Sequence, residues 1–348
     1  MTWRPLGILL AIVGASSLPA YSPPSRNDSA ICIHCHEAEI GNPSSMVSAS
    51  AVAGKSTLLL NRRVLEYMEG TYREQIRLDG ERALYTVSDG GHVFHTDLAW
   101  VMGSATMGQA FLYQDRQGNW RETQVTYYSA LGNLGRMLGG RAPTDLDSAT
   151  GELLPEAKAR GCFTCHATGL EPDAPLETSR LSPGVQCIQC HSGAKAHVDA
   201  VRNGSMIVPQ EQLSDLTSEG VSELCGKCHR TWSNIILNGP RGRDNVRFQP
   251  YRLANSKCFN AVDRRISCVA CHDPHHPVET SSRFYDSKCL SCHSADSKPV
   301  GNVQARVCKV GTEDCASCHM PKYTLTNTRE AFTDHWIRIV KPKEGYPD

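Results

Sequence analysis

The sequence predicts a fold of mostly short α-helices and loops, with a small antiparallel β segment in the N-terminal half. Three observations predict this class. Cysteine accounts for 16 of 348 residues, and most cysteines come in pairs spaced by two residues. Aromatic residues make up only 7% of the chain, whereas Gly and Pro together number 47, which is a thin supply for a conventional core. Alternation of apolar and polar residues, typical of strands, is found mainly between residues 65 and 135.

Seven of the cysteine pairs are followed at once by histidine, which gives the pattern C-x-x-C-H. The seven motifs are Cys32/Cys35/His36, Cys162/Cys165/His166, Cys187/Cys190/His191, Cys225/Cys228/His229, Cys268/Cys271/His272, Cys289/Cys292/His293 and Cys315/Cys318/His319. This pattern is the attachment site of c-type haem: two thioethers hold the porphyrin, and the histidine binds the iron as proximal ligand. We therefore expect seven covalent haems c, and a multihaem cytochrome in which short helices and loops wrap stacked haems.

Zinc sites and thiol redox pairs also use C-x-x-C, but neither needs a histidine at the next position. Histidine is 14 of 348 residues. The probability that a histidine follows all seven C-x-x-C pairs by chance is roughly 10⁻¹⁰. The pairs also do not group into the short, regular spacings of four-ligand zinc sites.

The first 20 residues are typical of a secretory signal peptide. Arg4 supplies a positive charge, residues 6–13 form a short apolar run, and small residues follow up to Ala20. The run is too short for a membrane span, and no later stretch approaches that length, so we expect no span after signal cleavage. An uncleaved anchor is the alternative. Haem is attached outside the cytoplasm, which agrees with a periplasmic or secreted protein.

Two cysteines remain outside the motifs, Cys258 and Cys308. In an oxidising compartment their simplest fate is a disulfide, and two separately buried thiols are the alternative. Basic and acidic residues number 36 each, so charge gives no indication of binding to nucleic acid or to an anionic membrane.

The motifs are spread unevenly along the chain. Residues 37–161 separate the first motif from the second, and the other six fall within 162–319. The sequence therefore predicts three parts: a signal peptide over 1–20, an N-terminal region over 21–150 with one haem site and a β-rich segment, and a six-haem domain over 151–348. Residues 21–30, rich in Pro and Ser, are typical of a linker.

Within the β-rich segment, residues 109–114 and 119–128 predict a hairpin around a Gly-containing turn at 115–118. Gly139, Gly140 and Pro143 mark the end of the segment. Further on, residues 155–160 predict the start of a helix that runs into the second motif, and residues 213–224 predict one that leads into the fourth.

A low-spin haem needs a sixth ligand, usually His or Met. Seven histidines remain after the proximal ones: His34, His92, His95, His197, His275, His276 and His335. We expect His197, in a helical stretch after the third motif, and His335 to be distal ligands. At least one of His275 and His276 is expected to be another, since a turn at Pro274 would send the rings towards different irons. One of His92 and His95 is a further candidate.

His34 lies between the two cysteines of the first motif, and we expect it to face solvent. This leaves at least one haem without a histidine. Met107, in a loop of small residues, and Met46 are candidates to fill the position, and the alternative for a methionine is to fill a gap in a core. If neither binds, one iron is open and accessible to a small ligand.

The region 161–335 resembles the multihaem cytochromes c related to cytochrome c554. The resemblance rests on Gly161-Cys162-Phe163-Thr164-Cys165-His166, on residues 184–191 with His197, on residues 268–275, and on residues 315–322 with Asp334-His335. Residues 42–128 are similar to the same proteins more weakly. The resemblance implies an electron-transfer protein with closely stacked haems, in which His275 and His335 are distal ligands. The chain departs from it in having seven motifs instead of four, and in Met107, where relatives can carry histidine.

The main functional prediction is electron transfer between a redox protein donor and a redox protein acceptor through a chain of haems. One alternative is a multihaem reductase or oxidase that acts on a small nitrogen or sulfur oxyanion at an open haem. The other is a subunit of an extracellular conducting filament, formed by self-assembly, in which the isolated first haem stacks on a neighbouring subunit.

Overall fold

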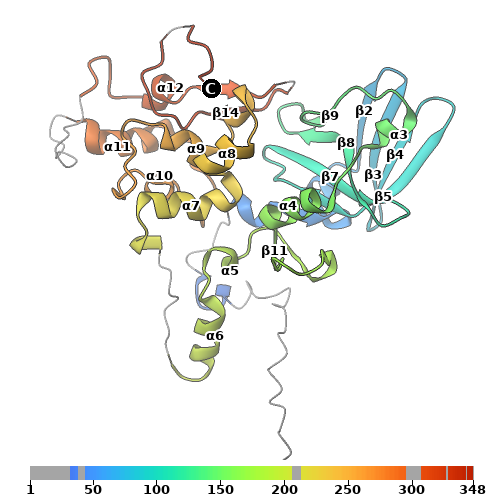
Figure 1. Cartoon of the computed structure of the whole chain (residues 1–348), viewed down its shortest axis with the longest axis horizontal. Helices are drawn as coiled ribbons and strands as arrows, with labels where there is room; N and C mark the ends of the chain where they lie inside the picture. The colour runs from blue at the N-terminus through green and yellow to red at the C-terminus, as the bar shows by residue number, and fades with distance from the viewer. Residues whose placement is uncertain are drawn as a thin grey trace, which may run out of the picture.

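The structure, a computed structural model, describes residues 32–37, 44–205, 213–294, 307–326, 328–341 and 343–347. Strands β1 to β10 gather on one side of the molecule, and the helices that carry six of the motifs gather on the other (Figure 1). Two further two-stranded sheets, β11 (Ala167–Thr168) with β12 (Ser182–Pro183) and β13 (Lys322–Thr324) with β14 (Ala331–Thr333), are separate from the strand-rich side. The predicted signal peptide (1–20) and linker (21–30) lie outside the described residues. Among the described helices, none has the length and apolar character needed to cross a membrane.

Two antiparallel sheets make up the strand-rich side. The first is a four-stranded meander of β2 (Val64–Glu69), β3 (Tyr72–Asp79), β4 (Arg82–Ser88) and β5 (Val93–Leu98). The second has the order β1-β6-β7-β8-β10, and β9 also pairs with β8. Its strands are β1 (Ser50–Val52), β6 (Trp100–Met102), β7 (Gly108–Gln114), β8 (Trp120–Tyr128), β9 (Asn133–Arg136) and β10 (Glu152–Leu153).

The predicted hairpin is confirmed, because β7 and β8 pair in antiparallel register. Asp115 and Gly118 close the turn: the Gly118 N–H donates to the Asp115 carbonyl at 2.9 Å, and Gly118 has a φ of +83°. The strands extend beyond the predicted range of 65–135, to β1 on one side and β10 on the other. Both additions are two or three residues long, too short to show a periodic pattern.

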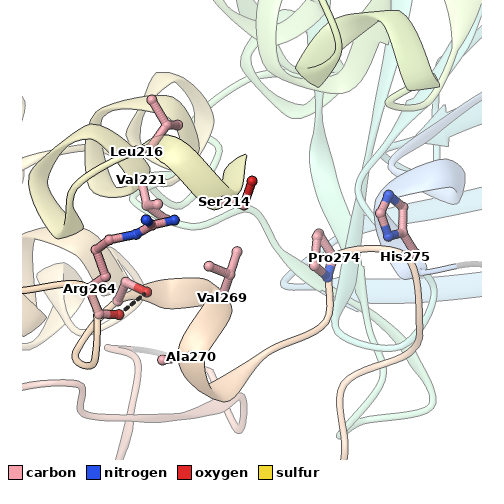
Figure 2. Close-up of a pocket in the computed structure, with 9 residues that line it drawn as sticks. Ser214, Leu216, Val221, Arg264, Val269, Ala270, Pro274 and His275 are labelled. Carbon is pink, nitrogen blue, oxygen red and sulfur yellow. Dashed lines mark hydrogen bonds between the residues drawn. The ribbon is translucent and has the colours of Figure 1, made fainter. Parts of the chain in front are cut away.

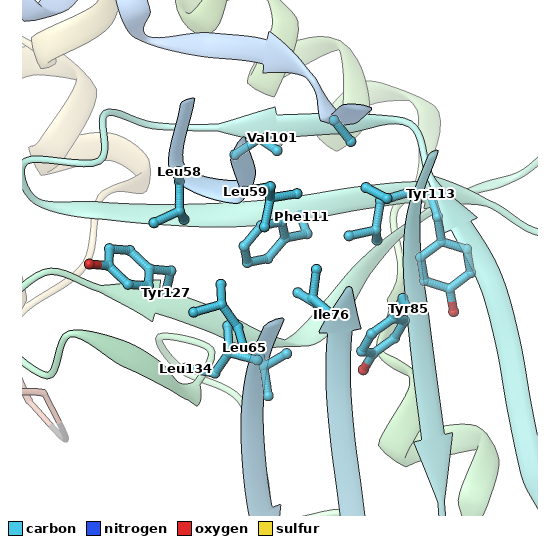
Figure 3. Close-up of a cluster of buried hydrophobic side chains, with 14 of the residues drawn as sticks. Leu58, Leu59, Leu65, Ile76, Tyr85, Val101, Phe111, Tyr113, Tyr127 and Leu134 are labelled. Atoms are coloured by element: carbon cyan, nitrogen blue, oxygen red, sulfur yellow. The ribbon is translucent and has the colours of Figure 1, made fainter. Parts of the chain in front are cut away.

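The two sheets enclose a hydrophobic core (Figure 3). Burial alternates along β3 and β4, so that every second side chain points inward. Ile76 and Tyr85 from the first sheet meet Phe111 and Val125 from the second, and all four are fully buried. Composition suggested a thin supply of residues for a conventional core, but this half contains such a core. Aromatic residues make up only 7% of the chain, but several of them are concentrated here.

Glu74 is buried in this core, with a side chain that bonds to the Tyr85 hydroxyl. Burial raises the pKa of Glu74 from 4.5 to about 7, and the bond from Tyr85 only partly opposes it. The folded state therefore favours the protonated carboxyl. Its contribution to stability is complete below pH 4.5 and is lost as the pH rises through about 7.

We expect the free energy of unfolding of the strand-rich half to fall by on the order of 3 kcal/mol between pH 4.5 and pH 8 through Glu74 alone. Glu74→Gln keeps a neutral side chain at this position and should remove that loss. Urea unfolding followed by far-UV circular dichroism at both pH values measures it. Equal pH dependence in the two proteins would contradict the assignment.

The other side of the molecule consists of short helices. They are α4 (Glu156–His166), α5 (Cys187–Cys190), α6 (Ala194–Arg202), α7 (Ser218–His229), α8 (Trp232–Asn238), α9 (Gln249–Ala254), α10 (Cys268–Cys271), α11 (Ser282–His293) and α12 (Cys315–His319). The predicted helix into the second motif is confirmed as α4. The helix into the fourth motif begins at Ser218 instead of 213, because Thr217 caps it by accepting the Gly220 N–H at 3.1 Å.

The second motif is packed against the outer face of the larger sheet. Phe163, between the two cysteines of that motif, is fully buried and makes edge-to-face contacts with Trp100 and Trp120 at ring-centre distances of 5.2 and 5.4 Å. These residues belong to a second hydrophobic cluster that joins α4 to the sheet. The sandwich thereby fixes the position of a haem attachment helix.

Candidate haem sites

The local backbone of the motifs places both cysteines and the histidine on one side of a helical turn. In the first, third and fifth motifs, the histidine N–H donates to the carbonyl of the first cysteine at 2.9 Å. Residues at i, i+3 and i+4 share one face of a helix. The C-x-x-C-H spacing therefore presents two sulfur atoms and an imidazole to the same side, as attachment of one haem requires.

Three motif histidines face a second histidine from a distant part of the chain. The ring centres are 6.4 Å apart in His36 and His197, 6.0 Å in His191 and His275, and 6.1 Å in His272 and His335. An imidazole nitrogen lies about 2.0–2.1 Å from a bound metal such as zinc. With iron at a similar distance between two rings, the ring centres come to about 6 Å. The three pairs fit axial ligation of three haem irons.

The hydrogen bonds of three histidines leave Nε2 free of a proton. Nδ1 of His166 donates to the Ala49 carbonyl at 2.8 Å, Nδ1 of His319 to Arg338 at 2.9 Å, and Nδ1 of His335 to Thr333 at 3.0 Å. A carbonyl can only accept, so Nδ1 carries the proton and Nε2 keeps its lone pair. Such bonds fix the ring orientation and tautomer of metal-binding histidines.

Burial keeps His335 neutral, as a ligand must be. It lowers the pKa of this imidazole to about 4, although the bond to Thr333 acts in the opposite direction. Burial also lowers the pKa of His166 and of His191, with the neighbouring His275 and His36 adding to the effect on His191.

The segment 44–50 holds His166 in place from the N-terminal side. Besides the bond from His166 to Ala49, the Ser50 hydroxyl donates to the His166 carbonyl at 2.5 Å and accepts the Gly184 N–H at 3.0 Å. Gly184 has a φ of +73°, and a Cβ there would lie 1.8 Å from the Val47 carbonyl oxygen. Only glycine allows this close approach.

Gly184→Ala should push the segment 44–50 away and weaken the bond that orients His166. We expect a loss of about 1–3 kcal/mol from the strained φ, with a further loss from the clash. Gly139→Ala is the matched control, because Gly139 has a φ of +79° but nothing within 4 Å of a Cβ. Denaturant midpoints measure the difference, and equal losses in the two variants would show that the clash is absent.

Neighbouring motifs approach each other through their cysteines. Side-chain hydrogen bonding between Cys165 and Cys228, between Cys225 and Cys268, and between Cys289 and Cys315 contributes to the pKa shifts of these thiols. The helices that carry these motifs touch in the same order: α4 with α7, α7 with α10, α10 with α11, and α11 with α12. The second, fourth, fifth, sixth and seventh motifs thus form one continuous series.

Two motif cysteines have a more open setting than the predicted wrapping of every haem site implies. Cys35 and Cys318, the second cysteines of the first and seventh motifs, are exposed, whereas the other twelve motif cysteines are half-buried. The hydroxyls of Ser291 and Ser317 lie 3.9 and 3.8 Å from Sγ of Cys292 and Cys318.

Cys35 and Cys318 are each the second cysteine of their pair and stand near the end of a short helical turn. A thioether needs the sulfur at the porphyrin edge and does not need a buried sulfur. Haem attachment at Cys35 and Cys318 therefore stays a prediction, as it does at the other motif cysteines, and these two sulfurs lack the enclosure that the sequence led us to expect.

Asp286 of α11 joins the last two motifs of the series. Its carboxylate accepts the Asp314 N–H at 2.7 Å and the Cys315 N–H at 2.8 Å, at the start of α12. The bond from Cys315 is the largest of the effects that lower the pKa of Asp286, and burial opposes it. The carboxylate therefore satisfies free N–H groups where the seventh motif begins.

An open cavity of about 390 Å³ lies beside the fifth motif (Figure 2). His275 and Pro274 stand at one side of it, and Leu216, Val221 and Arg264 stand at the other. Val269 and Ala270, the two residues between the motif cysteines, also line it. A largely apolar wall with a histidine at its edge fits the face of a porphyrin, and Arg264 fits a propionate.

The structure does not bring the two histidines of the sandwich to a motif. His92 lies in the turn before β5, where it is exposed and its Nδ1 is 3.4 Å from the Asp89 carboxylate. His95 is exposed on β5, which pairs with β4 at the end of its sheet. β5 lies on the far side of the sandwich from the motif helices (Figure 1).

His34, His276 and Met107 have surroundings different from those of the three histidine pairs. His34 is exposed, as predicted. His276 is partly exposed, and its Nδ1 lies 2.9 Å from the Asp273 carboxylate. Met107 is half-buried in the loop before β7, where the Ser129 N–H donates to its carbonyl at 2.8 Å. Axial ligation by His276 or Met107 stays a prediction, as does the disulfide, since Cys258 and Cys308 are both free, exposed thiols in the structure.

Sequence reasoning missed the residues that support the sites. Phe163 stands at a variable position of its motif, and nothing in the pattern distinguishes it from Thr164. Arg252, fully buried in α9, and Asp334 form an ion pair across 82 residues, which no local pattern reveals. The weak signal for Asp334 was its position next to His335.

Comparison with known proteins gives one match. Residues 142–192 match the family described as cytochrome c554 and c-prime. This segment contains the second and third motifs, and the match supports a c-type cytochrome electron carrier with covalently bound haem c. No curated protein and no solved structure matches the chain.

Proposed function

We propose that the chain is an exported seven-haem c-type cytochrome that transfers electrons between a donor and an acceptor redox protein through its covalently bound haems. Haem iron cycles between the ferric and ferrous states, and the protein sets each potential through axial ligands, burial and nearby charge. Short helices and loops would wrap the haems, next to the β sandwich. Export rests on the signal-like residues 1–20.

The observation that carries this proposal is the continuous contact between motifs. The helices that carry five motifs contact each other in the order second, fourth, fifth, sixth, seventh. Cysteines also interact across the second–fourth, fourth–fifth and sixth–seventh contacts. Each pair of cysteines holds one porphyrin edge, so porphyrins attached at touching helices would lie close together. Electron transfer is fast only over short distances, and this order gives a route from the second motif to the seventh.

The first and third motifs would join this route at its side. His275, four residues after the fifth motif's second cysteine, faces His191 of the third motif. His197, six residues after His191, faces His36 of the first. The first motif is distant in sequence but connected to the others through these two histidine pairs.

Reductive titration tests the proposal. Under anaerobic conditions the protein should take up seven electrons per chain, and carbon monoxide should leave the spectrum of the reduced protein unchanged, because a carrier needs no open iron. Binding of carbon monoxide to one haem per chain would favour the enzyme alternative.

One observation favours that alternative at the fourth motif. The guanidinium groups of Arg230 and Arg247 each lie 5.1 Å from the centre of the Phe248 ring, next to His229. Nε of Arg247 is buried and makes no hydrogen bond. Burial is the main cause that lowers the pKa of Arg247, and Arg230 adds to it. Two such cations fit a small oxyanion, or a haem propionate, at this position.

A further inference from the structure

Arg252 and Asp334 form an ion pair that is fully buried on both sides. Nε and Nη2 of Arg252 donate to the two carboxylate oxygens of Asp334 at 2.8 and 3.0 Å, which is the bidentate arrangement. Arg338 adds a third charged partner, whose Nη1 donates to Asp334 at 2.7 Å. Arg252 also lies over the rings of Trp336 and Tyr346.

This ion pair is attached to a candidate distal ligand. His335 follows Asp334 directly, and its ring faces His272 of the fifth motif. The Trp336 N–H donates back to the Asp334 carboxylate at 3.0 Å, so the backbone is tied to the carboxylate on both sides of His335. The Ser256 hydroxyl, two residues after α9, donates to the His335 carbonyl at 3.2 Å.

The same segment also holds the histidine of the seventh motif. The Arg338 N–H donates to the His319 carbonyl at 3.2 Å, and Nδ1 of His319 donates to the Arg338 carbonyl at 2.9 Å. Residues 334–338 therefore contact histidines of two sites. The Asp334 carboxylate accepts hydrogen bonds from the side chain of Arg338, at the other end of this segment, and from the side chain of Arg252 in α9.

A buried ion pair is weak evidence for stability, because apolar residues of similar size often replace it without loss. The bidentate geometry of this ion pair is better explained if the pair holds the neighbouring His335 in a fixed position. A metal-bound histidine depends on the groups around it for its orientation and basicity.

We propose that Arg252 is a positioning residue for two haems: through Asp334 and Arg338 it holds His335 on the iron of the fifth haem and keeps His319 of the seventh haem bonded to the backbone. This inference rests on the proposed function, since it assumes haem at both motifs. Without Arg252 the segment 334–338 loses its fixed contact to α9, and His335 leaves the iron.

The test compares the wild type with Arg252→Met and with the double variant Arg252→Met/Asp334→Leu, which leaves no unpaired charge in the interior. Both should retain every covalent haem by intact mass. Both should show a high-spin signal in electron paramagnetic resonance that amounts to one haem per chain, and the reduced protein should bind one equivalent of carbon monoxide. The midpoint potential of one further haem should rise, as the bond to His319 Nδ1 weakens.

Arg82→Met is the matched control, because Arg82 makes a bidentate pair with Asp97 in the sandwich, away from any motif. It should leave the haem spectrum unchanged. Arg252→Lys keeps the charge but not the fork of donors, and should give a smaller high-spin fraction than Arg252→Met.

If Arg252→Met does not accumulate as folded protein, the spectrum of Arg252→Met/Asp334→Leu alone tests the positioning role of Arg252. A double variant with every haem low-spin and no carbon monoxide binding would overturn the positioning role. A wild type that lacks haem at the fifth or seventh motif would instead overturn the proposed function, so the two failures are distinguishable.

Discussion

His335→Ala should convert one haem from six-coordinate low-spin to five-coordinate high-spin. His335 faces His272 at a ring-centre distance of 6.1 Å, and burial keeps its imidazole neutral. Removal of the ring leaves an iron with one protein ligand. Electron paramagnetic resonance should detect the high-spin iron, and the reduced variant should bind carbon monoxide at one haem per chain.

His335→Met gives a second readout. Methionine restores a sixth ligand, so the haem should remain low-spin, but its potential should rise, because His/Met ligation gives a higher potential than two histidines. His92→Ala is the matched control, since His92 is exposed in a turn of the sandwich. An unchanged spectrum in His335→Ala would contradict the assignment of His335 to the fifth haem.

Phe163→Ala should lower the free energy of unfolding by about 3–5 kcal/mol, the usual loss for a fully buried phenylalanine. Phe163 contacts Trp100 and Trp120 of the larger sheet, so the variant also separates the second attachment helix from the sandwich. We expect the haem at this motif to become more mobile and the denaturant midpoint to fall.

Thr164→Ala is the control for this prediction. Thr164 occupies the other middle position of the same motif, is exposed, and donates its hydroxyl to the Arg160 carbonyl within α4. A change of this kind at the surface stays within about 0.5 kcal/mol. Equal losses in the two variants would show that the contact with the tryptophans contributes nothing.

The sequence predicts the local features of this fold well. The C-x-x-C-H spacing, the helix that follows Pro155 and the hairpin around 115–118 depend on residues within one or two turns of each other, and such patterns are visible in a single chain. Placing His197 in a helix also succeeded, since α6 (Ala194–Arg202) contains it.

The long-range features could not be predicted in the same way. His92 and His197 are both single histidines outside a motif, and only the fold shows that one lies in a turn of the sandwich and the other beside His36. The exposure of Cys35 and Cys318 is of the same kind, because the motif pattern is identical at all seven sites and carries no information on what surrounds each one.

The core of the sandwich was underestimated for a related reason. Composition averages over the whole chain, whereas the buried aromatic residues Tyr85, Phe111 and Tyr113 are concentrated in one half. A low average therefore conceals one well-packed region beside a helical region with few large apolar side chains.

The number of covalent haems tests the central claim most directly. Intact mass under denaturing conditions, together with the pyridine haemochrome spectrum, gives that number for the mature protein. The account predicts seven haems per chain, one at each C-x-x-C-H motif. Five or fewer would contradict the interpretation of the motifs and, with it, the proposed electron route from the second motif to the seventh.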